Sequence, residues 1–243
     1  MDFILAIAIF LAFVVKGITG FANTLVFGSI MSFSTSTVNI TPIDLLTSIP
    51  SNALIAFKER KNINPKVFIP LSLLVVLGTI PGAILLKNGN VALLKIAFGF
   101  AVILIGLETL IRESKARKIK PNKIVLALIG VASGVLSGLF GVGAFLVAYI
   151  GRTTDNQAQF RGNICAVFLV ENTFRLILYS INGIINKDIL LTGIKVMPVM
   201  LVGLGVGIFL SSKISDKLVK KIVILMLMLT GLSLAISNIL SLL

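Results

Sequence analysis

The chain is built from long runs of apolar residues that are separated by short polar or basic stretches. A run of about 20 apolar residues is long enough for a helix to cross the hydrocarbon core of a bilayer. Runs of this kind occupy roughly residues 67–86, 92–111, 163–182, 189–210 and 219–241. A sixth run, roughly 39–57, contains Pro42 and Pro50. The pattern therefore predicts six membrane-crossing helices.

Two further apolar regions, 3–33 and 124–150, are each cut in the middle by a glycine-rich segment. The two breaks read Lys16-Gly17-Ile18-Thr19-Gly20 and Ser137-Gly138-Leu139-Phe140-Gly141. Each half has only about 12 to 15 residues, and a helix of that length spans about 20 Å of the roughly 30 Å hydrocarbon core. Each region is therefore either one long, broken crossing or a re-entrant hairpin that enters the membrane and returns.

The distribution of basic residues favours the hairpin. The loops 58–66 and 112–123 are strongly positive, which predicts that both lie in the cytoplasm. A single crossing at 124–150 would place the four lysines within 213–221 outside the cell. A hairpin keeps those lysines inside and leaves the nearly neutral turn at 187–188 outside. The first apolar region begins with Asp2 rather than with basic residues, so we expect no cleaved signal there.

The two halves of the chain resemble each other in two separate blocks. The segment from Gly17 to Val26 aligns with the segment from Gly138 to Val147 at an offset of 121 residues. A second block aligns at an offset of 125, and it matches Gly78, Gly82, Leu85, Lys95 and Gly106 with Gly203, Gly207, Leu210, Lys220 and Gly231. Two blocks in the same order indicate an internal repeat.

The repeat defines the expected architecture. With one hairpin and three crossings each, the repeats have an odd number of spans and must be inverted in the membrane, a plan that recurs in secondary transporters. The sequence therefore predicts an all-α integral membrane protein with two inverted repeats. The first repeat covers 1–111, a basic cytoplasmic linker covers 112–123, and the second repeat covers 124–243.

The composition agrees with this architecture. Hydrophobic residues make up 57% of the 243 residues, charged residues only 13%, and the mean hydropathy is +1.08. These values are typical of an integral membrane protein, and we expect a multi-pass protein of the cell membrane. Lys and Arg outnumber Asp and Glu by 22 to 9, but these charges flank the membrane, so no nucleic-acid partner is expected.

The residue inventory argues against an enzyme. The chain has no histidine and a single cysteine, Cys165, which excludes an intrachain disulfide and zinc or haem sites of the usual kind. Intramembrane proteolysis needs two apposed aspartates or a nucleophile with a base, and no histidine is present to serve Ser137 or Cys165. A phosphate-binding Gly-Lys-Ser/Thr loop is absent as well. We therefore expect neither a catalytic site nor a cofactor.

Several motifs resemble one family. They are Ser137 to Gly143 in the second hairpin, Phe160-Arg161-Gly162-Asn163, Glu171 to Tyr179, Thr47-Ser48, and Asn62-Ile63-Asn64. In these motifs the chain resembles the TauE/SafE sulfite exporter family, also called the TSUP family of anion permeases. The resemblance implies ion-driven export or uptake of sulfite, sulfonates or related small organic anions. Family members often have three consecutive glycines followed by a proline in the hairpin, and this pattern is absent from both hairpins, which leaves the anion itself open.

The hairpin tips are the first candidates for an anion site. Glycines let backbone N–H groups approach a ligand closely, and helix N-termini add a positive partial charge. The candidates at the tips are Gly17, Gly20, Asn23 and Thr24 in one half, and Gly138, Gly141 and Gly143 in the other. Thr47 and Ser48 join them because the resemblance places a Thr-Ser pair there. The alternative is that the glycines only allow helices to pack closely in lipid.

Ionisable residues inside spans are functional candidates by default. Lys16 adjoins the first tip, and it either attracts an anion, pairs with a nearby acid or extends its charged end to the membrane interface. Glu171 and Arg175 are four residues apart on one helix, with Asn172 beside them, and form either a neutralising salt bridge or a substrate site.

The remaining polar residues of these spans have less specific roles. Asn163 and Arg161 begin the helix that carries Arg175, and each either joins the site or caps the helix. Asp44, Glu108 and Lys195 are expected at the membrane interface.

These features together predict a secondary transporter of small anions, with membrane lipid around it and a coupling proton or sodium ion. The helices outside the site form a scaffold on which a homodimer could assemble. Two alternatives stay open, a passive anion channel and a non-transporting factor whose basic loops bind acidic lipids. The sequence does not distinguish import from export, or one coupling ion from the other.

Overall fold

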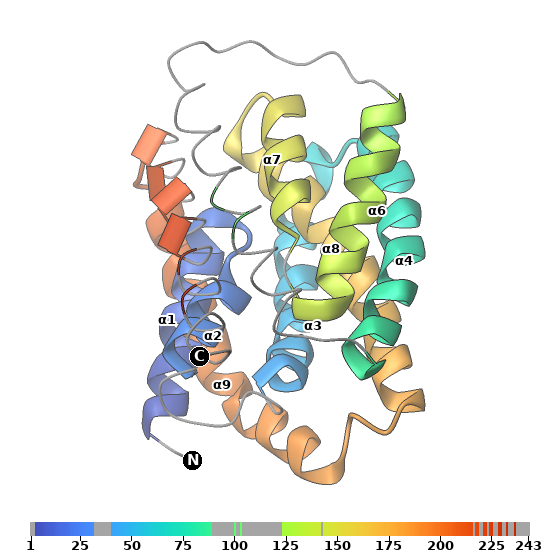
Figure 1. The fold of residues 1–243 in the computed structure, drawn as a ribbon. Coiled ribbons are helices and arrows are strands. Elements are labelled where there is room, and N and C mark those ends of the chain that lie inside the picture. Colours follow the sequence, from blue (N-terminus) through green and yellow to red (C-terminus); the bar gives the residue numbers. More distant parts are fainter. Residues whose placement is uncertain are drawn as a thin grey trace.

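The computed structural model describes residues 3–31, 40–88, 123–141 and 143–215, together with isolated residues within 100–103 and 217–236. The regular elements of this part are all helices (Figure 1). They are α1 (Phe3–Thr19), α2 (Asn23–Met31), α3 (Ile40–Lys58), the short 3-10 helix η2 (Arg60–Asn62), α4 (Pro65–Asn88), α6 (Lys123–Phe140), α7 (Ala144–Thr153), α8 (Gln157–Ile181) and α9 (Lys187–Ser211).

Four of the six predicted crossings correspond to α3, α4, α8 and α9. In the described part, three helices have an apolar stretch long enough to cross a membrane, at Pro65–Gly82, Gln157–Ile181 and Lys187–Ser211. Helix α3 has 19 residues, which is long enough for a crossing, but it carries a buried row of polar residues. The predicted crossings 92–111 and 219–241 and the linker 112–123 lie almost entirely outside the described residues.

Both glycine-rich breaks are turns at which the chain reverses its direction (Figure 1). Gly20 and Gly141 have φ angles of +88° and +72°, a left-handed conformation that ends a helix and that glycine adopts without strain. Helix α2 then packs against α1, and α7 packs against α6. Each broken region is therefore a helical hairpin with one long and one short arm.

The hairpins pack against helices of the opposite half. Helix α1 lies beside α9, and α6 lies beside α4. A side chain at any of four glycines would overlap a backbone carbonyl of the neighbouring helix, and the pairs are Gly78 with Val131, Gly82 with Val135, Gly203 with Phe10, and Gly207 with Val14. The two sets of pairs superimpose at the offsets of 125 and 121 residues that relate the repeated blocks. Glycine allows this direct contact between helix backbones.

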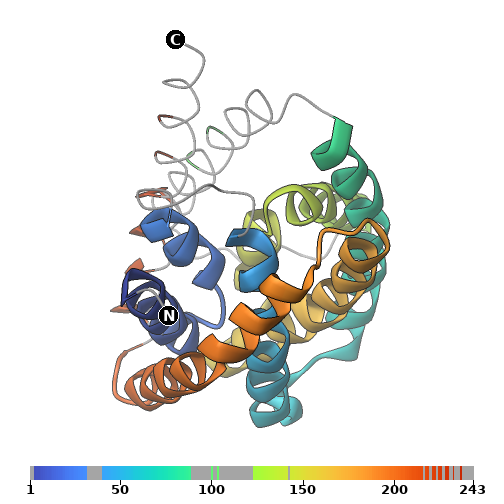
Figure 2. The ribbon, with the colours of Figure 1, turned by 90° about the horizontal axis from the view of Figure 1, so that it is seen from below.

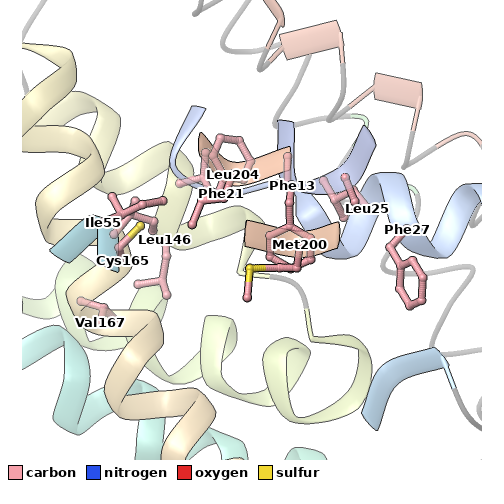
Figure 3. Packing of buried hydrophobic residues seen from close by; sticks show 14 of the residues in the cluster. Phe13, Phe21, Leu25, Phe27, Ile55, Leu146, Cys165, Val167, Met200 and Leu204 are labelled. Carbon is pink, nitrogen blue, oxygen red and sulfur yellow. The ribbon is translucent and has the colours of Figure 1, made fainter. Parts of the chain in front are cut away.

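Helices α3 and α8 pack against each other in the middle of the molecule. Seen from below, α3 lies between the α1–α2 hairpin and the pair α4 and α6 (Figure 2). Buried side chains of the hairpins, α8 and α9 form the hydrophobic core, with Phe13, Leu146, Cys165 and Met200 among them (Figure 3). Apolar residues on the outer faces of α4 and α9 are exposed, as expected for helices in contact with lipid.

Candidate functional site

The two hairpin tips meet beside the central helices. A methyl group added to Gly141 of the second tip would lie 3.3 Å from Cγ2 of Thr24 in the first hairpin. A small cavity lies where they meet. Its polar lining comprises Lys16, Asn23, Thr24, Ser48, Asn52 and Asn172. Its apolar lining includes Phe21, Leu25 and Phe168, and Gly141 and Gly143 bring the backbone of the second tip to its wall.

Lys16 is a buried ammonium that has no acidic partner among the described residues. The last turn of α1 places it beside the cavity, and only 1% of the residue is exposed. No ion pair of Lys16 is found within the described ranges, and the nearest aromatic ring is that of Phe13, whose centroid lies 5.6 Å from Nζ. A buried charge is costly unless an opposite charge or hydrogen bonds compensate it. The cavity therefore contains a cation whose burial an anionic ligand would stabilise.

Asp44 fastens the first hairpin to α3. The Asn23 amide Nδ2 donates to Asp44 Oδ1 and to Ser48 Oγ, both at 2.7 Å. The Thr24 hydroxyl donates to Asp44 Oδ2 at 2.5 Å. Asp44 is fully buried inside the protein, and its depth relative to the membrane interface stays a prediction. Its position near the start of α3 does not reveal that α2 folds back over it.

Arg175 fastens the second hairpin to α8. Its Nη1 donates to the carbonyl oxygen of Ser137 at 2.6 Å, and its Nη2 donates to Asn172 Oδ1 at 3.0 Å. Its Nε lies 3.6 Å from Glu171 Oε1. This contact is the ion pair that the spacing of four residues on one helix predicts. Because the Asn172 oxygen accepts from Arg175, the Asn172 amide nitrogen is left to donate to another partner. Arg175 thus orients a hydrogen-bond donor of the cavity wall.

Asn52 is a residue of the cavity wall that the sequence analysis missed. It is fully buried on α3, and neither its amide nitrogen nor its amide oxygen has a hydrogen-bond partner within the described part of the chain. Buried amides in folded proteins are almost always hydrogen-bonded, so an unpartnered one at a cavity indicates a ligand position. The one sequence signal was its spacing of four residues from Ser48.

The structure brings seven of the fourteen predicted site residues to the cavity wall. They are Lys16, Asn23, Thr24, Ser48, Gly141, Gly143 and Asn172. Arg175 and Glu171 lie directly behind this wall. Arg175 donates to Asn172, and a methyl group added to Gly141 would lie 2.9 Å from Arg175 Nη1. The cavity therefore joins residues of both halves of the chain, as the hairpin interpretation predicts.

Five predicted residues have other contacts. Gly17 packs on the backbone of Gly207, and Gly20 turns the chain beneath Arg161 and accepts a hydrogen bond from the Cys165 thiol at 3.0 Å. The Thr47 hydroxyl donates to backbone carbonyls within α3, and the Gly138 carbonyl accepts from the Tyr179 hydroxyl at 3.5 Å. Asn163 Oδ1 accepts from the Asn64 backbone N–H, and its Nδ2 donates to the Gln159 carbonyl.

The start of α8 is capped by a residue other than the two considered. Asn156 is the N-cap, and its side chain accepts from the Gln159 backbone N–H at 2.9 Å. Arg161 instead forms an ion pair of 2.8 Å with Glu59 at the end of α3. The capping alternative for Arg161 and Asn163 is therefore wrong, and both residues join α8 to the connection between α3 and α4.

The chemistry of the cavity follows from this lining. It offers one free ammonium, amide and hydroxyl groups, and backbone at a glycine tip, all within apolar surroundings. Within the described ranges, no three His, Cys, Asp or Glu side chains are grouped to hold a metal ion. Such a lining suits a small anion that is bound by hydrogen bonds and one positive charge.

Long apolar helices around a buried polar cavity are typical of an integral membrane protein. Residues 5–234 match the family model described as sulfite exporter TauE/SafE. Because the match extends over nearly the whole chain, the chain belongs to this family, which is a family of membrane transporters rather than of enzymes. No curated protein and no solved structure matches the chain.

Proposed function

We propose that this chain is a secondary transporter that moves small organic or sulfur-containing anions, such as sulfite or sulfonates, across the cell membrane with the help of an ion gradient. The observation on which the proposal depends is Lys16, a buried ammonium that forms no ion pair with the described residues and lines a cavity between two hairpin tips. An oxyanion placed there would accept hydrogen bonds from Lys16 and from the amide nitrogens of Asn52 and Asn172. Its charge would offset the cost of burying the ammonium.

The arrangement of the helices supports a transport cycle between two inverted repeats. In Figure 1, α1 and α9 run upward whereas α4 and α6 run downward. The matching glycine contacts relate the pair α1 and α9 to the pair α4 and α6. Transporters of inverted repeats bind substrate at the repeat interface and expose it by moving one part against the other. Both halves of the chain contribute to the wall of the cavity, which supports a binding site between the two proposed repeats.

The proposal is tested with purified protein in proteoliposomes. Uptake of sulfite, thiosulfate, organosulfonates and carboxylates is measured with and without a proton or sodium gradient. We predict that Lys16→Met lowers kcat/KM for the transported anion at least about tenfold, because one charged contact to the anion is worth roughly 1.5–3 kcal/mol. The melting temperature in detergent shows whether the variant is folded, and it should stay close to the wild-type value because the variant loses no salt bridge within the described ranges.

Lys66→Met is the matched control, because Lys66 is an exposed residue at the start of α4. It should transport like the wild type. If Lys16→Met also transports every anion of the panel like the wild type, the anion is not bound at Lys16 and the proposal is wrong. A wild-type protein that moves none of these anions would contradict the proposed function as a whole.

A further inference from the structure

Asp44 is a buried carboxylate directly behind the cavity wall. Two residues of the wall, Asn23 and Thr24, donate to its two oxygens, and Ser48 of the wall shares the Asn23 amide. Asn23 and Thr24 are the first two residues of α2, so Asp44 is fastened to the hairpin immediately after its tip. Any change in the charge of Asp44 therefore acts on both the cavity and the hairpin.

The buried charges of this region balance only while the cavity is empty. Apart from the pair of Glu59 with Arg161, the buried Asp, Glu, Lys and Arg side chains of the described ranges are Lys16, Arg175, Asp44 and Glu171. Glu171 and Arg175 form an ion pair, which leaves one cation and one carboxylate. An anion bound at Lys16 pairs with that ammonium and leaves the carboxylate of Asp44 without a cation to offset it. A proton on Asp44 would restore neutrality at a depth where uncompensated charge is expensive.

We propose that Asp44 carries the coupling proton, so that one proton and one anion cross the membrane together. This inference rests on the proposed function. The O–H bond on Asp44 forms on one side of the membrane and breaks on the other, and no other bond changes.

The surroundings of Asp44 suit a proton better than a metal ion. Hard cations such as sodium are held by several oxygen atoms, but an amide nitrogen occupies one oxygen of Asp44. Rotation of the Asn23 amide would present its oxygen to a protonated carboxyl group, so Asp44 stays hydrogen-bonded in either state. The charges that act on Asp44 are Lys16 of α1 and Arg175 of α8, whereas α2 contributes uncharged side chains and the ionisable residues of α9 are exposed.

The test uses wild type and Asp44→Asn in proteoliposomes that contain a pH-sensitive dye. Accumulation of radiolabelled sulfite is driven by an imposed pH gradient, and counterflow of sulfite is measured separately at equal pH on both sides. We expect Asp44→Asn to lose at least about nine-tenths of the gradient-driven accumulation and the sulfite-dependent dye signal. Counterflow should remain, because the permanently neutral amide mimics the protonated carboxyl group. Asp188→Asn, an exposed residue in the first turn of α9, is the matched control and should behave like the wild type.

The outcomes separate the two proposals. Wild-type protein without any sulfite counterflow contradicts the proposed function for sulfite. Wild-type counterflow without proton movement, or full gradient-driven accumulation by Asp44→Asn, contradicts the role of Asp44 and leaves the transport function intact.

A second variant, Thr24→Val, keeps the carboxyl group and removes one donor that stabilises its charged form. The pH at half-maximal gradient-driven uptake should then rise by about one unit, and an unchanged pH profile would overturn the inference.

Discussion

Asp44 and Arg175 hold the two hairpin tips from opposite central helices and with opposite charges. Asp44 accepts from two side chains at the start of α2, and Arg175 donates to the last turn of α6 and to Asn172. All three nitrogens of the Arg175 guanidinium thus face protein groups, since Nε faces Glu171. In the part of the chain that the structure describes, Lys16 has no such partner. The geometry therefore favours Lys16 as the cation that meets the anion and Arg175 as the residue that positions the second tip.

The role of Arg175 leads to a prediction about charge removal. Arg175→Gln strands the carboxylate of Glu171 and should destabilise the protein by roughly 3–5 kcal/mol. The double variant Arg175→Gln with Glu171→Gln should regain much of that stability but not transport, because Ser137 and Asn172 lose their charged donor. Arg175→Lys keeps the charge without the planar fork and should be partly active.

Thermal unfolding in detergent and sulfite uptake in proteoliposomes measure these two effects separately. Full transport by the double variant would show that the second tip keeps its position without Arg175. In that case the hydrogen bond from Nη1 to Ser137 would have no part in transport.

Single residues show how far the site could be predicted. Lys16, Arg175 and the tip residues Asn23 and Thr24 are visible in the sequence because polar groups are rare in apolar runs. Asp44 and Asn52 are equally rare, but their importance depends on a hairpin that folds back onto α3. The pattern of polar and apolar residues within α3 does not show that α2 packs against this helix.

At the scale of elements, each hairpin depends on one glycine in a left-handed conformation. Gly141 has a φ of +72°, and a methyl group there would lie 2.9 Å from Arg175 Nη1. Gly183 has a nearly equal φ of +69°, but a methyl group there would meet nothing within 4 Å. A substitution at Gly183 therefore tests backbone strain alone, whereas the same substitution at Gly141 tests strain together with steric overlap in the site.

We predict that Gly183→Ala costs about 1–2 kcal/mol of stability from strain alone and leaves transport intact. Gly141→Ala should show the same strain and also displace Arg175 and Thr24, so its sulfite uptake should fall at least about tenfold. The comparison is made with protein amounts matched after purification. Equal uptake by the two variants would mean that the second tip does not contact the anion.

The elements themselves were largely predictable. Runs of apolar residues located α3, α4, α8 and α9, and glycines located both turns. Helix α3 continues through Pro42 and Pro50, although both interrupt the apolar pattern. Pro42 lies in the first turn, where a missing N–H does no harm, and kinked helices in membranes are supported by their neighbours. The sequence does not predict that α1 packs on α9 and α6 on α4, because a helix face of small residues can pack closely against many different helices.

At the scale of the whole molecule, the proposed topology places basic ends on one side. Helices α3, α6 and α9 have their basic flanks at the upper end in Figure 1, and the turn before α9 lies at the lower end. Single cysteines at Lys66 and Lys217 in a Cys165→Ser background should be protected from an impermeant thiol reagent in intact cells. A cysteine at Lys187 should be labelled. Labelling at position 217 with protection at position 187 would contradict the inverted repeats.

The pairing of α1 with α9 constrains how the protein can be made. Residues 20–186 lie between these two helices, so the ribosome completes most of the chain before the partner of α1 exists. Until then, the face of α1 that ends in backbone contact with Gly203 and Gly207 is in lipid or against the insertion machinery. Helix α4 of the first half is likewise made before α6 of the second half, against which it packs. Each hairpin therefore gains its main helix partner only when a helix of the other half of the chain is present.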